Sequence, residues 1–338
     1  MIGYFATVWR GDHSSMPRAC ALAPNRKLRS RAGSEFARSA LAALALTVCA
    51  AAAAAQDAAA DAEQDKRALE TVHFTSLDGV TNLTAYLGRH KGDAPRPAVV
   101  LMHGCSGLLN PKGSIFPIYR AWMRALFARG YDVLTVDSAA PRGFGQTCTA
   151  GPERIAMHRD RPRDAYAALA YLQAQPSVRA DRVALMGWSQ GGGIVLLTIS
   201  DKSIGRSPAL SRDFAAAVAF YPGACSERLQ SKPFTAVEPQ GWTTAIPLLV
   251  LFGDADVWTP QAPCEAFISG AKARGNPVEL KSYPGAVHAF DAPNLPRTEL
   301  PAYRNGNGPI PVIGTDKEAR ADAFPRVLDY LERLLLQP

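Results

Sequence analysis

The sequence predicts an α/β protein whose central, mostly parallel sheet is covered by helices on both faces. From residue 72 onward, strand patterns alternate with helix patterns without a break in composition, which is typical of such sheets. Several strand patterns are continuous apolar runs, as at 97–102, and this suits strands that are buried on both faces. Because such sheets bind ligands at the carboxyl ends of their strands, functional residues are expected there.

The elements are assigned in chain order. A β-hairpin is predicted from strands at 72–77 and 81–87, which flank the turn residues Asp78 and Gly79. The remaining strands are predicted at 97–102, 131–136, 182–186, 215–221, 248–252 and 278–283. Helices are predicted at 118–129, 163–175, 192–199, 261–274 and 316–336. The segment 292–314 contains five prolines, and a loop of this length in a compact domain is either functional or mobile.

Residues 1–55 are expected to form a signal peptide for export, with an unusually long start. Five basic residues between 26 and 38 precede an uncharged run, rich in alanine and leucine, that ends in alanines before Gln56. A membrane anchor is the alternative, although the run is near the lower length limit for spanning a bilayer. Residues 56–70 are then a flexible mature N-terminus and 71–338 a single domain, in a protein that is periplasmic or secreted.

The charge distribution argues against a nucleic-acid partner. The whole chain has a net charge of +7, to which residues 1–55 contribute +5, so the remainder carries only +2. The basic character therefore belongs largely to the leader, and no basic patch indicates nucleic-acid binding. No stable membrane association is expected once the leader is removed.

Four cysteines follow Gln56, and an even count in an exported protein predicts two disulfides with three alternative connectivities. Cys225 follows a predicted strand, and Cys264 opens the helix after the next strand. Their loops can meet at one edge of the sheet, so Cys225–Cys264 is favoured, which leaves Cys105–Cys148 as the second pair. Free buried thiols are the alternative.

A candidate nucleophile lies in the pentapeptide Gly187-Trp188-Ser189-Gln190-Gly191, between a predicted strand and a predicted helix. A G-x-S-x-G sequence in this position is the nucleophile elbow, a sharp turn that exposes the serine hydroxyl. The glycines permit a strained turn and close packing of the neighbouring backbones. The alternative is a glycine-rich turn with an incidental serine.

A serine nucleophile needs a histidine base and a carboxylate that orients it, in the chain order serine, acid, histidine. His288 is the one histidine after the serine, and it lies just past the last predicted strand. The strand at 248–252 is followed by Asp254 and Asp256, and their spacing does not choose between them. Asp291 lies only three residues after the histidine, and Asp137 precedes the serine, so both are less suitable.

An oxyanion hole requires two backbone N–H groups. The Gln190 amide, directly after the serine and at the amino end of a helix, is one candidate donor. The other is the Cys105 amide, because the loop His103-Gly104-Cys105 follows the first apolar strand. We expect His103 to be structural.

Four segments, at 97–108, 187–192, 253–256 and 283–290, together resemble the dienelactone hydrolase family of the α/β-hydrolase superfamily. They occur in order across about residues 70–335. The resemblance implies an α/β-hydrolase fold, Asp256 rather than Asp254 as the acid, and oxyanion donors at Cys105 and Gln190. It implies no metal and no organic cofactor.

Two departures from the family pattern bear on the substrate. The best-known members use a cysteine nucleophile, where this chain has Ser189, and a glutamate where it has Gly104. The sequence is therefore identified as a serine-nucleophile member, which suits ordinary carboxylic esters better than dienelactones.

The prediction is an exported serine hydrolase that cleaves small-molecule esters through an acyl-enzyme. Three residues are candidate substrate contacts: Trp188, Trp258 and Arg142. Trp188 can instead pack beneath the elbow, and Arg142 can instead form a structural salt bridge. The alternative functions are hydrolysis of a polyester or peptide ester in an open cleft, dienelactone-type lactone hydrolysis, and non-catalytic binding.

Overall fold

The computed structural model describes residues 69–92, 94–149, 151–207, 209–210, 212–304 and 306–336. The predicted signal peptide at 1–55 lies outside the described residues, and so does most of the predicted flexible segment 56–70. The chain from Leu69 onward forms one compact unit. Its first strand, β1 (Leu69–Thr75), begins two residues before the predicted start of the domain.

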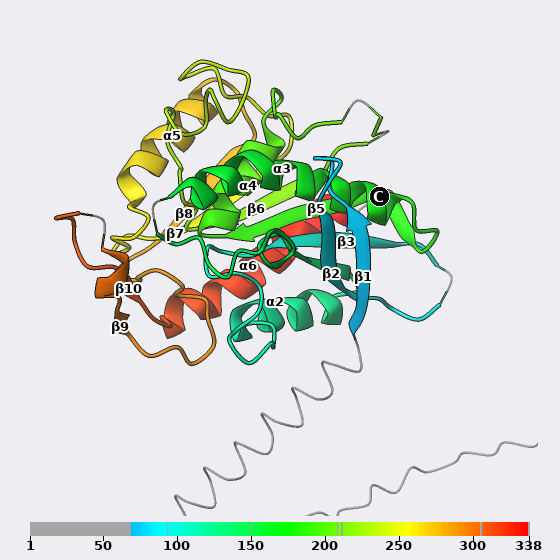
Figure 1. The fold of residues 1–338 in the computed structure, drawn as a ribbon, viewed down its shortest axis with the longest axis horizontal. Coiled ribbons are helices and arrows are strands. Elements are labelled where there is room, and N and C mark those ends of the chain that lie inside the picture. The colour runs from blue at the N-terminus through cyan, green and yellow to red at the C-terminus, as the bar shows by residue number, and fades with distance from the viewer. Residues whose placement is uncertain are drawn as a thin grey trace, which may run out of the picture. The chain divides into compact units, whose positions relative to one another are not determined.

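The core of this unit is an eight-stranded sheet with the order β1-β2-β4-β3-β5-β6-β7-β8 (Figure 1). β1 and β2 form the predicted antiparallel hairpin, β2 also pairs antiparallel with β4, and all other pairs are parallel. The strands after β1 are β2 (Asn82–Gly88), β3 (Arg96–Met102), β4 (Asp132–Asp137), β5 (Val178–Trp188), β6 (Ala216–Phe220), β7 (Leu248–Gly253) and β8 (Val278–Tyr283). The predicted mostly parallel sheet is confirmed.

Helices cover both faces of the sheet, as predicted. α2 (Pro117–Ala128) and α6 (Lys317–Leu335) lie on one face, whereas α3 (Pro152–Gln173) and α4 (Gln190–Ile199) lie together on the other (Figure 1). α5 (Gln261–Ala273) packs beside β8. Within the described residues, no helix has both the length and the apolar character needed to cross a membrane.

The predicted start of α3 is wrong by eleven residues, because the helix begins at Pro152 and not at 163. A proline inside a helix removes a hydrogen bond and crowds the preceding turn, so Pro162 resembles a boundary in the sequence. In the structure the helix continues through Pro162, which is buried. The extra turns carry Arg161, a residue that becomes important at the site.

The segment 292–314 is not simply a loop. It contains a small antiparallel ribbon of β9 (Thr298–Glu299) and β10 (Val312–Ile313), with the 3₁₀ turn η3 (Pro301–Tyr303) between them. The Gly314 amide donates to the carbonyl of His288 at 3.0 Å. The segment is therefore joined to the loop that carries the predicted base.

Candidate active site

The predicted elbow is present between β5 and α4. Ser189 has φ 54° and ψ −118°, a strained backbone conformation of the kind found at functional sites. A Cβ atom at Gly187 would overlap the carbonyl of Gly191, and one at Gly191 would overlap that of Met102. The two glycines therefore allow β5, α4 and β3 to pack closely enough to hold Ser189 at the carboxyl edge of the sheet.

His288 is bound to Asp256 at the same edge. The His288 Nδ1 atom lies 2.6 Å from Asp256 Oδ2, and both side chains are buried. The carboxylate also accepts hydrogen bonds from the Trp258 amide, the Thr259 amide and the Thr259 hydroxyl, at 2.8, 3.0 and 2.8 Å. These three donors hold the carboxylate in place, and its bond to Nδ1–H leaves Nε2 of His288 as the basic nitrogen.

The other candidate carboxylates have different partners. Asp254 is exposed and accepts the Gly285 amide at 2.7 Å, which closes the turn before the histidine loop. Asp137 accepts the amides of Ala139 and Ala140, both at 3.0 Å. Among the described aspartates, the one that contacts Nδ1 of His288 is Asp256, and the geometry thus separates two residues that the spacing does not.

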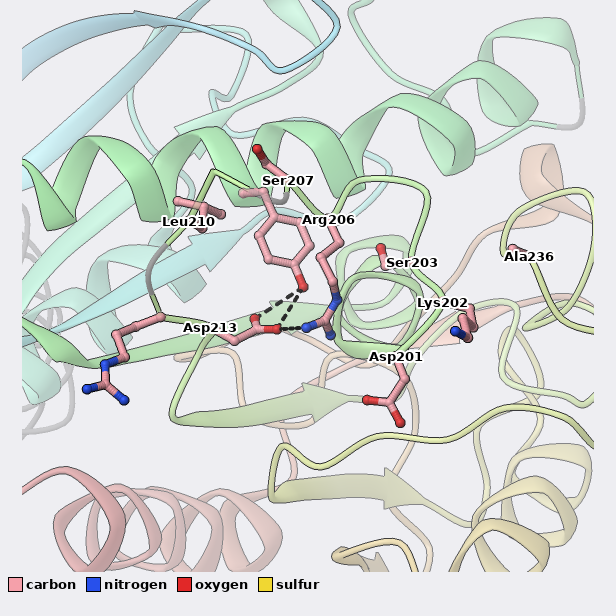
Figure 2. A pocket seen from close by; sticks show the side chains of 10 residues that line it. Asp201, Lys202, Ser203, Arg206, Ser207, Leu210, Asp213 and Ala236 are labelled. Carbon is pink, nitrogen blue, oxygen red and sulfur yellow. Dashed lines mark hydrogen bonds and ion pairs between the residues drawn. The ribbon is translucent and has the colours of Figure 1, made fainter.

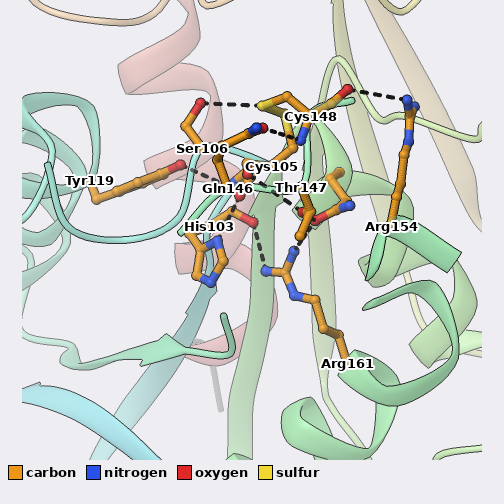
Figure 3. Close-up of a disulfide and its surroundings, with 11 residues drawn as sticks. His103, Cys105, Ser106, Tyr119, Gln146, Thr147, Cys148, Arg154 and Arg161 are labelled. Atoms are coloured by element: carbon orange, nitrogen blue, oxygen red, sulfur yellow. Dashed lines mark hydrogen bonds between the residues drawn. A yellow bond between two sulfur atoms is a disulfide. The ribbon is translucent and has the colours of Figure 1, made fainter. Parts of the chain in front are cut away.

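The predicted oxyanion loop is tied down from several sides (Figure 3). A disulfide joins Cys105 to Cys148, and the Thr147 amide donates to the Cys105 carbonyl at 2.8 Å. The Gly104 amide donates to the Tyr119 hydroxyl at 2.8 Å. The Cys105 backbone is therefore anchored beside the elbow by a covalent bond and by a hydrogen bond.

His103 has the structural role that we expected. Its Nδ1 atom donates to the Gly104 carbonyl at 2.6 Å, and its Nε2 atom accepts the Ser138 amide at 3.2 Å. Burial lowers the pKa of His103 well below the usual range. The ring is neutral at ordinary pH, with both nitrogens occupied.

Arg161, which is not among the predicted site residues, connects the elbow to the oxyanion loop (Figure 3). Its Nη2 atom donates to the His103 carbonyl at 2.6 Å, and its Nη1 atom donates to Gln190 Oε1 at 3.0 Å. Burial lowers the pKa of this fully buried guanidinium to about 10, so it is charged at neutral pH. No sequence signal marks Arg161, because the predicted helix begins after it.

A cavity of about 470 Å³ opens beside Ser189 and His288. Ser106, on the oxyanion loop, and Trp258 also border it. The Trp258 ring lies 5.0 Å from the His288 ring and 5.4 Å from the Tyr303 ring, centroid to centroid. The remaining walls are largely apolar side chains from the start of α2 and from the segment 292–314.

Trp188 borders the cavity only as part of its buried floor. It is 1% exposed and stacks on Phe220, with the ring centroids 5.7 Å apart. Its indole N–H donates to Asp291 at 2.9 Å, and this carboxylate also accepts the Trp122 N–H and the Tyr221 hydroxyl at 2.8 and 2.7 Å. Asp291 is therefore a buried anchor beneath the site, and burial raises its pKa.

Of the two roles considered for Arg142, the structure shows the structural salt bridge and not a place at the cavity. Arg142 lies in the 3₁₀ turn η2 (Ala140–Arg142) and does not border the cavity. Its guanidinium makes two hydrogen bonds of 2.8 Å to Asp164 and one of 2.9 Å to Asp78. Both carboxylates come from other segments of the chain. They neutralise the positive charge of Arg142, which is therefore not available to bind a substrate carboxylate.

The second disulfide joins Cys225 to Cys264. The two bonded pairs are those that the sequence favours. This disulfide links the segment after β6 to α5, and neither cysteine borders the cavity.

A second hollow, at the other end of the sheet, carries no comparable chemistry (Figure 2). It is bordered by Asp201, Lys202 and the ion pair of Arg206 with Asp213. The Tyr166 hydroxyl donates to the same Asp213 at 3.1 Å. Within the part of the chain that the structure describes, no group of three or more His, Cys, Asp or Glu side chains is arranged to hold a metal ion.

Comparisons with known proteins agree with this architecture. A Bradyrhizobium protein named "Probable 2-oxo-3-(5-oxofuran-2-ylidene)propanoate lactonase" is 29% identical over 235 residues, which are 66% of this chain and 86% of that protein. A crystal structure of a Klebsiella pneumoniae protein named as a dienelactone hydrolase has a TM-score of 0.57 and 21% identity, over 79% of this chain and 99% of that one.

The structure of Thermogutta terrifontis esterase 2, phosphoramylated by tabun, has a TM-score of 0.53 and 19% identity, over 79% of this chain and 94% of that one. The likeness to these two structures concerns the fold. The dienelactone hydrolase family model matches residues 83–335. The chain therefore belongs to the dienelactone hydrolase family, within the α/β-hydrolase fold, and is a hydrolase that acts on esters.

Proposed function

We propose that the protein cleaves carboxylic esters through an acyl-enzyme on Ser189. The observation that carries this proposal is the 2.6 Å contact between the buried Asp256 and His288, which borders the same cavity as Ser189. A serine hydroxyl is a weak nucleophile at neutral pH and needs a base whose ring is oriented by a third group. His288 and Asp256 fit these two roles.

In the proposed reaction, Nε2 of His288 takes the proton of Ser189 as its Oγ atom attacks the ester carbonyl. Asp256 holds the ring and stabilises the imidazolium that forms. The amides of Cys105 and Gln190 donate to the oxyanion, and such a donor is typically worth about 3 kcal/mol of barrier. His288 then protonates the leaving alcohol, and the same steps with water release the acid.

The size of the cavity favours a small ester over a polymer. A volume of about 470 Å³ is typical of small-molecule sites, and the segment 292–314 closes one side. The leader pattern at 1–55 and the two disulfides support export to the periplasm or the medium, because disulfides persist in oxidising compartments.

The proposal is tested by labelling with a fluorophosphonate and by hydrolysis of p-tolyl acetate, for the wild type and for Ser189→Ala. We expect the wild type to label and to turn over the ester, and the variant to do neither. A wild type that neither labels nor hydrolyses any ester would overturn the proposal. Full activity in Ser189→Ala would show that the nucleophile is another residue.

The acid is tested by the matched variants Asp256→Asn and Asp254→Asn. Loss of the orienting carboxylate typically costs about 10⁴ in kcat, whereas Asp254 only closes a turn at the surface. We therefore expect a large loss for Asp256→Asn and kcat within about threefold of the wild type for Asp254→Asn. Equal losses would rule out our assignment.

A further inference from the structure

The cavity beside Ser189 contains no charged side chain among the described residues that border it. Its walls are formed mainly by half-buried apolar side chains from separate parts of the chain: Phe116, Ile118, Trp258, Leu300, Tyr303 and Ile313. The polar residues on its border are Ser189, His288 and the oxyanion loop, where the proposed chemistry takes place, together with the uncharged side chains of Asn294, Tyr119, Tyr221 and Tyr303. The proposed reacting residues therefore share the cavity with a large wall of side chains that carry no charge.

Three arginines of the surrounding segments make hydrogen bonds within the protein and do not border the cavity. Arg142 is saturated by Asp164 and Asp78. Arg161 lies behind the oxyanion loop with both Nη atoms engaged. Arg304, beyond η3, donates to the carbonyls of Gly308 and Asn307 at 2.6 and 3.3 Å.

A substrate carboxylate that enters this cavity would lose water without gaining a cation, and burial of an unpaired charge is strongly unfavourable. An uncharged apolar group gains from the same surface, since transfer of apolar area from water is favourable. The tilted rings of Trp258 and Tyr303, 5.4 Å apart and 34° from parallel, form a wall suited to a flat ring. Aromatic pairs at such distances add to the gain from burial.

We propose that the substrate is an uncharged ester that places an apolar, preferably aromatic, group against Trp258 and Tyr303, and that anionic esters are rejected. The inference rests on the proposed function of Ser189 and names the substrate class of that site. It also marks a departure from the Bradyrhizobium relative, whose name describes a lactone that carries a propanoate group. The two chains are expected to share the reaction and to differ in the charge of the substrate.

The test uses three acetate esters that differ at one ring position: p-tolyl acetate, 4-acetoxybenzamide and 4-acetoxybenzoate. Each kcat/KM is divided by the hydroxide-catalysed rate of the same ester, which corrects for the leaving group. We expect p-tolyl acetate to be the best substrate and the carboxylate to be at least about 100-fold poorer than its neutral isostere, the amide. Equal values for the amide and the carboxylate would overturn the inference.

Two variants test the wall itself. Leu300→Lys adds a cation to the cavity border, and Leu300→Met is the uncharged control. Leu300→Lys should reduce the ratio of kcat/KM for 4-acetoxybenzamide to kcat/KM for 4-acetoxybenzoate by about tenfold or more. Tyr303→Ala should lower kcat/KM for p-tolyl acetate at least fivefold more than for methyl acetate. Failure of both variants to change selectivity would overturn the placement of the ring.

These outcomes are distinguishable from failure of the proposed function. If no ester is hydrolysed and the fluorophosphonate does not label Ser189, the reaction itself is wrong. If labelling and turnover occur without charge selectivity, the serine chemistry stands and the substrate class is wrong.

Discussion

Replacement of Arg161 by methionine should impair catalysis beyond its effect on stability. The arginine makes two hydrogen bonds from a charged donor, to the His103 carbonyl at 2.6 Å and to Gln190 Oε1 at 3.0 Å. Such bonds contribute about 1.5–3 kcal/mol each. Removal of the buried charge itself offsets part of this loss, so we expect the free energy of unfolding to fall by about 2–4 kcal/mol.

The catalytic effect follows from where the two acceptors lie. His103 is two residues before Cys105, and Gln190 carries the other proposed oxyanion amide, so we expect Arg161 to hold the two proposed donors at a fixed separation. Loss of one oxyanion donor typically lowers kcat by about 10²–10³. We expect about a 10²-fold loss of kcat in Arg161→Met, with KM changed less than about threefold. Arg161→Lys keeps the positive charge but loses the planar guanidinium that reaches both acceptors, so its kcat should lie between those of the wild type and Arg161→Met.

The assay measures kcat and KM for p-tolyl acetate, together with urea unfolding of each variant. Tyr166→Phe is the matched control, because Tyr166 lies on the same helix, is buried, and has its hydroxyl 3.1 Å from both Asp213 and the Thr198 carbonyl, away from the cavity. It should lose stability and keep kcat. If Arg161→Met is folded and its kcat is within about threefold of that of Tyr166→Phe, the positioning role is refuted.

Three further predictions concern the surroundings of the site. Arg142→Met should lower the free energy of unfolding by about 3–5 kcal/mol, because it leaves buried Asp164 unpaired, while kcat stays within about threefold; a large kcat loss at unchanged stability would contradict this. Joint replacement of Cys105 and Cys148 by serine should cost about 2–4 kcal/mol of stability and about tenfold in kcat, whereas the same change at the other disulfide should lower stability alone. Burial lowers the pKa of His158 to about 4, so between about pH 6.5 and 4 the unfolded chain binds the extra proton and stability falls as the pH falls, by up to about 1.4 kcal/mol per pH unit. Urea unfolding at several pH values should show a weaker fall in His158→Gln, and an identical fall would contradict the assignment.

The positions of Ser189 and His288 could be predicted because local rules constrain them. An elbow needs small residues two positions before and two positions after the serine, and a single histidine follows it in the chain. The strands could be predicted for a related reason, since burial on both faces leaves a continuous apolar run. Asp254 and Asp256 cannot be told apart by spacing, because what separates them is burial and partners: Asp254 is exposed and accepts the Gly285 amide, whereas Asp256 is buried and accepts from Thr259.

By itself, the sequence determined the α/β architecture, the elbow and the chain order of the proposed catalytic groups, because each leaves a pattern within a few residues. The tertiary structure decided which charged side chains are already paired within the protein and which of them lie at the site. Arg142 and Arg161 look alike as isolated arginines, yet one is held by Asp164 and Asp78 and the other spans the elbow and the oxyanion loop. The partner of a charged side chain comes from a distant segment, so it is visible only after the sheet has brought those segments together.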